Sequence, residues 1–240
     1  MKTNGGSAVP PFLLPDDIVK WGIYDRRNEK NRPNRSTKEA KQGIDALEAI
    51  LTRRSTRNYK PDAVEAEKLD QILKAAGQAP SGGNNQHNHF LVIRNRDVIQ
   101  KLIVMTEAAF AEMEIQENTY ASLKHAISAS KRGGYIFCYN APVLIAVANR
   151  LDYGNNMADC ACAIENMMIA ANALDLGSCW INQLKWLNGE PELTGYLRSL
   201  GMKEDERIYG AVILGYPATE SGLPNRNLMQ QKGNTITYID

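Results

Sequence analysis

Three arginines and two hydroxyl side chains occupy the five residues of segment 53–57, which reads RRSTR. Guanidinium groups are planar and permanently charged, so three of them this close together repel one another unless an anion lies between them. Arginine binds phosphate oxygens in a bidentate manner, and the hydroxyl of Ser55 adds a further short hydrogen bond. The segment therefore predicts a cradle for a phosphate group, the alternative being an ordinary basic turn in solvent.

A second segment that suits ligand binding lies at residues 79–86 and reads APSGGNNQ. Proline fixes its backbone, the two glycines allow close approach to a ligand, and the asparagine amides offer both donors and acceptors. Such a lining suits the edge of a heterocyclic ring, although a plain Pro-Ser-Gly-Gly turn fits the same residues. Together the two segments predict a phosphorylated cofactor that carries a flat ring.

These segments resemble the first two motifs of the FMN-dependent nitroreductase family. Residues 173–182, which read ALDLGSCWIN, are similar to the third motif of that family. Residues 213–217, which read ILGYP, and the tripeptide PNR at 224–226 are similar to the fourth. The four motifs follow one another in the family's order, and the resemblance runs from about Ile44 to the C-terminus.

The resemblance implies which residues bind the phosphate end of FMN. Arg53, Arg54 and Ser55 match the positions that hold the phosphate and the ribityl chain. Arg226 matches a basic residue that completes the phosphate site. The residues on either side of Arg226 are asparagines here, where the family often has basic residues. The resemblance therefore implies a phosphate site with one cation fewer than usual.

The resemblance also implies contacts to the flavin ring. Arg57 matches a basic residue beside the pyrimidine edge, where a fixed cation favours the reduced flavin because reduction leaves negative charge at N1 and O2. The backbone N–H groups of Asn182 and Gln183 match the donors to N5 and O4. The alternative for this segment is a core strand in which Trp180 and Ile181 are simply packed.

A homodimer with two FMN sites at its interface is a further implication of the resemblance. Pro80, Ser81, Gly82 and Asn84 match the loop that reaches the flavin of the partner subunit. Family members often follow the glutamine of this loop with Pro-Trp, whereas this chain has HNH at 87–89. The two histidines are interpreted as surface or supporting groups rather than as acid–base catalysts.

The implied activity is that of an NAD(P)H oxidoreductase that reduces small electrophilic acceptors, such as nitroaromatics or quinones, by ping-pong hydride transfer through FMN. The electron donor is NADH or NADPH. No side chain is nominated as catalytic, because hydride passes to and from flavin N5 and solvent can supply protons. The alternatives are a flavin-dependent oxidase, dehydrogenase or dehalogenase on the same fold, and a non-catalytic flavin-binding protein.

Charge, apolar stretches and cysteine spacing argue against several classes of function. The 240 residues carry a formal net charge of +1, so nothing indicates attraction to nucleic acid or to an anionic membrane. The sequence contains no apolar stretch long enough for a membrane span and no secretion signal, and we expect a cytoplasmic protein. Four cysteines lack metal-ligand spacing, which predicts buried free thiols and no metal site.

Hydrophobic periodicity predicts the elements that position these segments. We expect helices at 44–51, 66–78, 98–131 with one interruption, and 157–174. We expect strands at 89–94, 141–148 and 207–214, with a peripheral one at 235–239. The order of helices and strands predicts an α+β fold, and the resemblance implies a three-layer nitroreductase-like fold with a central, mostly antiparallel sheet flanked by helices. A Rossmann domain is not expected, because the elements do not alternate as βαβ and no G-x-G-x-x-G opens a helix after a strand.

The chain divides into two parts by composition. Residues 44–240 form the expected FMN-binding domain. Residues 1–43 are rich in proline, asparagine and basic residues, with apolar anchors that include Phe12 and Trp21. We expect an extended arm or a short helix that packs on the dimer, the alternative being a partly disordered tail.

Overall fold

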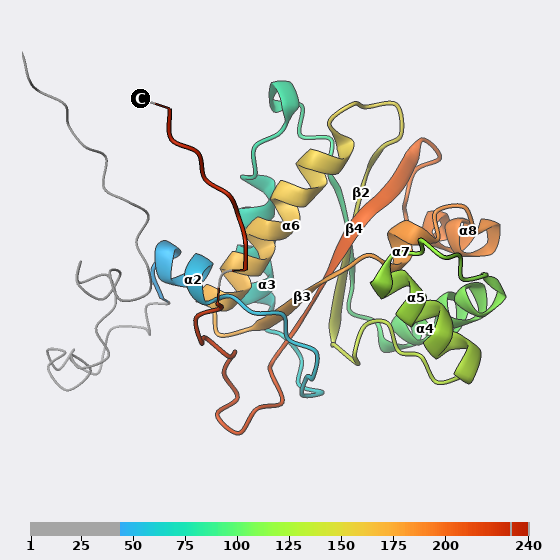
Figure 1. Cartoon of the computed structure of the whole chain (residues 1–240), viewed down its shortest axis with the longest axis horizontal. Coiled ribbons are helices and arrows are strands. Elements are labelled where there is room, and N and C mark those ends of the chain that lie inside the picture. The colour runs from blue at the N-terminus through green and yellow to red at the C-terminus, as the bar shows by residue number, and fades with distance from the viewer. Residues whose placement is uncertain (1–43, 231, 240) are drawn as a thin grey trace, which may run out of the picture. The chain divides into compact units, whose positions relative to one another are not determined.

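A computed structural model describes residues 44–230 and 232–239 of the chain. Its centre is a sheet of β1 (His89–Ile93), β2 (Val143–Arg150), β3 (Gly177–Ile181) and β4 (Glu206–Gly215). The strand order is β1-β2-β4-β3, and each neighbouring pair is antiparallel (Figure 1). The predicted α+β class and antiparallel sheet are therefore confirmed.

Both faces of the sheet are covered, as the continuous apolar run of β2 predicts. Alternate residues of a strand point to opposite faces, so β2 contributes to two separate cores. Leu144, Ala146 and Ala148 enter one apolar cluster. Residues 143, 145 and 147 of the same strand enter the other.

Helices form the two outer layers. On one face lie α3 (Ala66–Gly77) and α6 (Asn156–Ala173), with the short α2 (Ala46–Thr52) packed against α6. On the other face lie α4 (Arg96–Glu112), α5 (Ala121–Arg132), α7 (Gln183–Trp186) and α8 (Pro191–Ser199) (Figure 1). The break at 113–120 is the single interruption expected in the long helical region, and Gly133, at φ 85°, ends α5.

Two sequence-based predictions differ from the structure. The predicted strand at 235–239 is wrong, because this segment has no strand partner among the described residues, and Ile239 is 94% exposed. A strand needs a neighbouring strand to satisfy its backbone groups. Ile44 lies just before α2, because Asp45 caps the helix by accepting the Glu48 N–H at 2.9 Å. The sequence analysis also gave no prediction for α8, which begins at a proline.

The prediction about an N-terminal arm falls on residues 1–43, outside the described residues, and it stays a prediction. Among the described residues, no helix combines the length and apolar character needed to cross a membrane.

Candidate active site

Asn172, near the end of α6, joins two of the predicted phosphate-binding segments. Its side-chain Nδ2 donates to the Ala49 carbonyl at 2.9 Å and to the Thr52 hydroxyl at 3.1 Å. Its Oδ1 accepts from Arg226 Nε at 3.3 Å, and its carbonyl accepts from Arg226 Nη2. Because Thr52 directly precedes Arg53, this buried amide brings the C-terminal arginine to the arginine-rich segment. The sequence analysis missed Asn172, whose only signal is a polar residue on an apolar helix.

The arginines of this cradle differ in how they are paired. Arg53 Nε lies 3.4 Å from Glu165 Oε1, and Arg226 Nη2 lies 2.7 Å from Asp175 Oδ1. Arg54 Nη1 donates to nearby carbonyls, whereas its Nη2 is buried and has no hydrogen-bond partner within the described residues. Burial, followed by the charge of Arg53, lowers the pKa of Arg54. A buried cationic donor without an acceptor is the kind of group that a phosphate oxygen satisfies.

The arginine-rich segment runs alongside β3. Ser55 forms a parallel bridge with Ser178, and the Thr56 N–H donates to the Ser178 carbonyl at 2.8 Å. Gly177 permits this approach, because a Cβ atom there would lie 2.6 Å from the Thr56 hydroxyl. The segment is therefore fixed to the sheet by its backbone, which leaves Ser55 exposed.

Cys179 directly follows Ser178 in β3, and the pKa of its thiol is affected by the arginine-rich segment. Burial raises the pKa of the Cys179 thiol. The charge of Arg57, the Ser55 hydroxyl and the charge of Arg53 oppose that rise, in this order.

The predicted backbone donors lie where β3 ends and α7 begins. Asn182 is the N-cap of α7, and its Oδ1 accepts from Trp180 Nε1 at 2.8 Å. Gln183 is the first residue of the helix, and the N–H groups at such a start have no intrahelical acceptor. Four residues separate Ser178 from Asn182, which is about 13 Å of strand. The alternative of a core strand is also confirmed, since β3 covers 177–181.

The side chain of Gln183 connects this junction to the segment that follows α5. Its Nε2 donates to the Tyr135 hydroxyl at 2.8 Å, while its Oε1 is buried with no partner in the described part of the chain. The Tyr135 N–H donates to Glu107 Oε1 at 2.7 Å. Burial raises the pKa of Tyr135 to about 12, against the effect of the Gln183 bond. Tyr135 was missed by the sequence analysis; its only signal was its place directly after two glycines.

The predicted loop with Pro80, Ser81, Gly82 and Asn84 lies at the other end of α6. The Gly82 N–H donates to Asp159 Oδ1 at 3.1 Å, and Asp159 lies in the first turn of α6. Figure 1 shows α2, which leads into the cradle, and η2 (Gly82–Asn84) at opposite ends of α6.

One chain therefore does not bring all of the predicted residues together. Asp159 contacts the loop and Asn172 contacts the cradle, and these helix positions are thirteen residues apart in the sequence, which is about 20 Å at 1.5 Å per residue. Those near the cradle are Arg53, Arg54, Ser55, Arg57 and Arg226, with Asn182 and Gln183 at the far end of β3. The loop residues therefore lie at the end of α6 opposite to the phosphate cradle.

Comparison with known proteins identifies the family. The model of the Nitroreductase family matches residues 50–216. The chain belongs to the nitroreductase family. A solved nitroreductase with bound FMN from Bacteroides fragilis is 36% identical to it with a TM-score of 0.71, over 82% of this chain and 100% of that one. Another with bound FMN, from Desulfitobacterium hafniense, is 26% identical with a TM-score of 0.67 and the same coverage.

A curated relative adds a link to pyridine nucleotides. A protein of Archaeoglobus fulgidus is 30% identical over 176 residues, which are 73% of this chain and 87% of that protein. Its name pairs NADH dehydrogenase with NAD(P)H nitroreductase.

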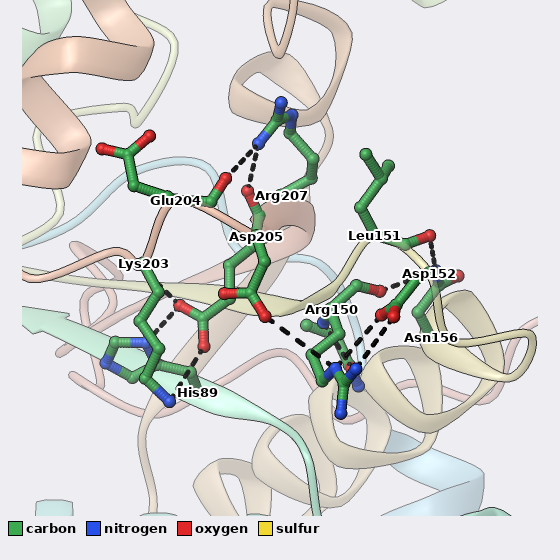
Figure 2. A network of polar contacts seen from close by, with 11 residues as sticks. His89, Arg150, Leu151, Asp152, Asn156, Lys203, Glu204, Asp205 and Arg207 are labelled. Atoms are coloured by element: carbon green, nitrogen blue, oxygen red, sulfur yellow. Dashed lines mark hydrogen bonds and ion pairs between the residues drawn. The ribbon is translucent and has the colours of Figure 1, made fainter.

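His89, the last residue of the HNH segment, belongs to a separate polar cluster in this nitroreductase-family chain. His89 Nδ1 lies 2.7 Å from Glu206 Oε2, and the same oxygen accepts the Lys203 N–H at 2.9 Å. Figure 2 shows His89 and Lys203 on the left side of this cluster and Arg150 to their right. A cavity of about 690 Å³ adjoins it. Because Glu206 is buried and bonded from both sides, His89 acts here as a structural partner of β4.

The four cysteines are free thiols, and Cys162 is the least buried of them. Among the described residues, no group of three histidine, cysteine, aspartate or glutamate side chains is arranged to hold a metal ion.

Proposed function

We propose that this chain is an FMN-dependent NAD(P)H oxidoreductase that reduces small electrophilic acceptors, such as nitroaromatics or quinones. The observation that carries the proposal is the cradle built around Asn172. That residue joins Arg226 to the arginine-rich segment, and Arg54 offers a buried donor with no acceptor in the described chain. Family membership and the FMN-bound relatives support the choice of cofactor.

Each group of residues has a role in this proposal. Arg53, Arg54 and Arg226 bind the phosphate, with the Ser55 hydroxyl as a further donor. Arg57 follows the cradle residues on the side of the β3–α7 junction. Its positive charge would lie beside the flavin ring and favour electron transfer to it. The backbone N–H groups of residues 182 and 183 bind the N5 and O4 edge of the ring.

Bound FMN supplies the hydride chemistry, accepting from NADH or NADPH and delivering to the acceptor in separate half-reactions. The chain orients the ring between the cradle and the β3–α7 junction and positions the donor carbon close to N5. No acid–base side chain is assigned, because solvent can supply the protons.

The proposal includes a homodimer with FMN at the subunit interface. Its support is that the tip of the loop, residues 83–86, is exposed and can contact a second copy. The apolar side chains of Leu47, Ile50 and Leu51 on α2 are 62%, 50% and 41% exposed, as expected of a surface that a second copy covers. Apart from the second copy and the small-molecule acceptor, no partner is proposed. A cytoplasmic location remains a prediction from the sequence.

The experiment is to purify the full chain, measure its flavin content and mass, and record its absorption spectrum under anaerobic conditions. We expect one FMN per subunit, bleaching by NADH or NADPH, and recovery of the oxidised spectrum on adding a quinone or nitroaromatic. A protein that cannot take up FMN would contradict the proposal. Flavin that pyridine nucleotide does not bleach would indicate a flavin-binding protein, and oxygen consumption without NAD(P)H would indicate an oxidase.

A further inference from the structure

We propose that Asp159 and Tyr153 are positioning residues that hold the loop at 80–84 in the shape that completes the FMN site of a second copy of this chain. This inference rests on the proposed function, because it concerns how one subunit presents the loop to its partner. Neither residue was among those predicted from the sequence; Tyr153 lies between β2 and α6, and Asp159 lies in the first turn of α6.

Both backbone polar groups of Gly82 are held from the same side. Its N–H donates to Asp159 Oδ1 at 3.1 Å, and its carbonyl accepts the Tyr153 hydroxyl at 2.9 Å. A Cβ atom at Gly82 would lie 2.0 Å from Asn155 Nδ2 and 2.6 Å from Tyr153 Oη. The backbone therefore lies directly on the α6 end, a closeness that glycine alone allows.

We call the two hydrogen bonds to Gly82 the clamp. The loop residues that follow it have backbone conformations that most residue types rarely adopt. Gly83, Asn84 and Gln86 have φ values of 60°, 54° and 51°, in the left-handed region. Side chains other than glycine adopt this region rarely, and they persist there when surrounding contacts enforce it. Asn84 itself is exposed, so the enforcing contacts come from the clamped residue before it and from hydrogen bonds such as that of the Gln86 N–H to Ser81 Oγ at 3.1 Å.

Asp159 is suited to this clamping role by its surroundings. It is 4% exposed and lies in the first turn of α6, where the helix dipole favours a carboxylate. Its Oδ2 is buried with no hydrogen-bond partner in the described chain, so the Gly82 N–H is the one donor that the Asp159 side chain has among the described residues. A carboxylate removed from water in this way is a strong acceptor for a backbone N–H.

The exit of the loop is tied to the same helix. Asn88 Nδ2 donates to the Asp159 carbonyl at 3.0 Å, and Asn88 Oδ1 accepts from Asn149 Nδ2 at 2.9 Å. Entry and exit are thus both fixed to the start of α6, while the tip at residues 83–86 faces solvent. Because the tip of the loop is already ordered, FMN binding in the partner subunit does not have to offset the entropy cost of ordering it.

The first test uses three variants of the full chain, with FMN affinity of the apoprotein measured by flavin fluorescence and the dimer mass measured in parallel. Asp159→Ala removes the acceptor, and we expect FMN binding to weaken about tenfold or more, the effect of one hydrogen bond to a charged group. Asp159→Asn keeps an oxygen acceptor and is the matched control, with affinity expected to stay close to that of the wild type. Tyr153→Phe removes the second contact at a partly exposed site and should weaken FMN binding severalfold.

The result that overturns the inference is wild-type FMN affinity in both Asp159→Ala and Tyr153→Phe. If Asp159→Ala does not fold, Tyr153→Phe carries the same decision alone. If the wild-type chain itself takes up no FMN, the proposed function has failed, and the inference falls with it.

A second test asks whether the clamp acts on the partner's site. A subunit with Arg53→Ala and an intact loop is co-expressed, under a different tag, with a subunit carrying Asp159→Ala and an intact cradle. In the mixed dimer, one site combines both defects and the other combines the two intact halves. We expect one FMN per mixed dimer at wild-type affinity, although each parent homodimer binds weakly. A mixed dimer without any wild-type site would show that the loop serves its own subunit, and would overturn the inference.

Discussion

The arginines of the cradle carry the same charge but have different environments. Arg53 and Arg226 each face a carboxylate, and the guanidinium of Arg54 is partly buried against carbonyl oxygens. Arg57 is exposed, and the described residues provide it with no ion pair. The first three are therefore suited to binding, whereas the charge of Arg57 is free to act on a group placed beside it.

Arg57→Ala should lower the reduction potential of the bound FMN by tens of millivolts while leaving FMN affinity nearly unchanged. The reason is that its charge acts on the reduced ring, and for a two-electron couple about 30 mV corresponds to about 1.4 kcal/mol. Spectroscopic titration against a reference dye measures the potential. Arg57→Lys should retain most of it, and an unchanged potential in Arg57→Ala would remove this residue from the edge of the ring.

The hydrogen bond between Tyr135 and Gln183 should stabilise the fold, which can be measured without FMN. Tyr135→Phe leaves the buried amide of Gln183 without any side-chain partner, and an unsatisfied buried polar group costs about 1–3 kcal/mol. We expect the free energy of unfolding in urea to fall by that amount. Tyr139→Phe is the control, because the hydroxyl of Tyr139 makes no hydrogen bond within the described residues. Equal stability of the two variants would contradict the role of the Tyr135–Gln183 bond.

At the scale of elements, β1 and β4 are linked through a buried carboxylate although they are not neighbours in the sheet. Glu206 at the start of β4 bonds to His89 at the start of β1, and its side chain is 2% exposed. Burial alone would raise the pKa of Glu206, but the bonds from His89 and the Lys203 N–H, with the charges of both residues, lower it overall. A carboxyl with a depressed pKa stabilises the fold above its unfolded pKa, here 4.5, and loses that contribution as the pH falls through its folded pKa.

Glu206→Gln should therefore lower the free energy of unfolding at pH 7 by about 2 kcal/mol, the size of a hydrogen bond to a charged group. The difference from the wild type should shrink as the pH falls below 4.5 and through the lowered folded pKa of Glu206, because the wild-type carboxyl is then protonated. Denaturant unfolding across this pH range measures both effects. Glu204→Gln is the matched control, since its ion pair with Arg198 is on the surface and such pairs contribute less than about 1 kcal/mol.

At the scale of the whole molecule, α2 has an apolar face and few contacts of its own. Leu47, Ile50 and Leu51 lie on one side of the helix and are all exposed, while Ala49 and Thr52 on the other side are buried. Covering such side chains contributes about 1 kcal/mol or more for each. The same helix leads directly into the cradle at Arg53, so a surface that joins two copies here would also support the cofactor site.

Leu47→Asp with Ile50→Asp should convert the proposed dimer to monomer and weaken FMN binding, because in that proposal each copy then lacks the loop of the other. Light scattering during gel filtration, over a range of concentrations, measures the mass. Val104→Asp is the control, since Val104 is similarly exposed at 56% but lies on α4. A double variant that keeps the dimeric mass would exclude α2 from the interface.

The amino-acid sequence determined those features that depend on neighbouring residues. The helix at 66–78, the strand at 89–94 and the interrupted helix pair followed from local hydrophobic periodicity, and the structure confirms them within a residue or two. The chemistry of segment 53–57 followed from residue types alone, since guanidinium and hydroxyl groups have the same binding preferences in any fold. The four motifs likewise identified the family, because each consists of consecutive residues.

Tertiary structure decided the features that depend on distant contacts. Asn172 could not be selected from the sequence, because its role arises only where α6 meets both the end of α2 and the segment around Arg226. The apolar alternation at 235–239 predicted a strand, but a strand forms only beside a partner, and the described chain supplies none there. The separation of the loop from the cradle was equally hidden, because the length of α6 between Asp159 and Asn172 sets that distance only after both segments have docked on the helix.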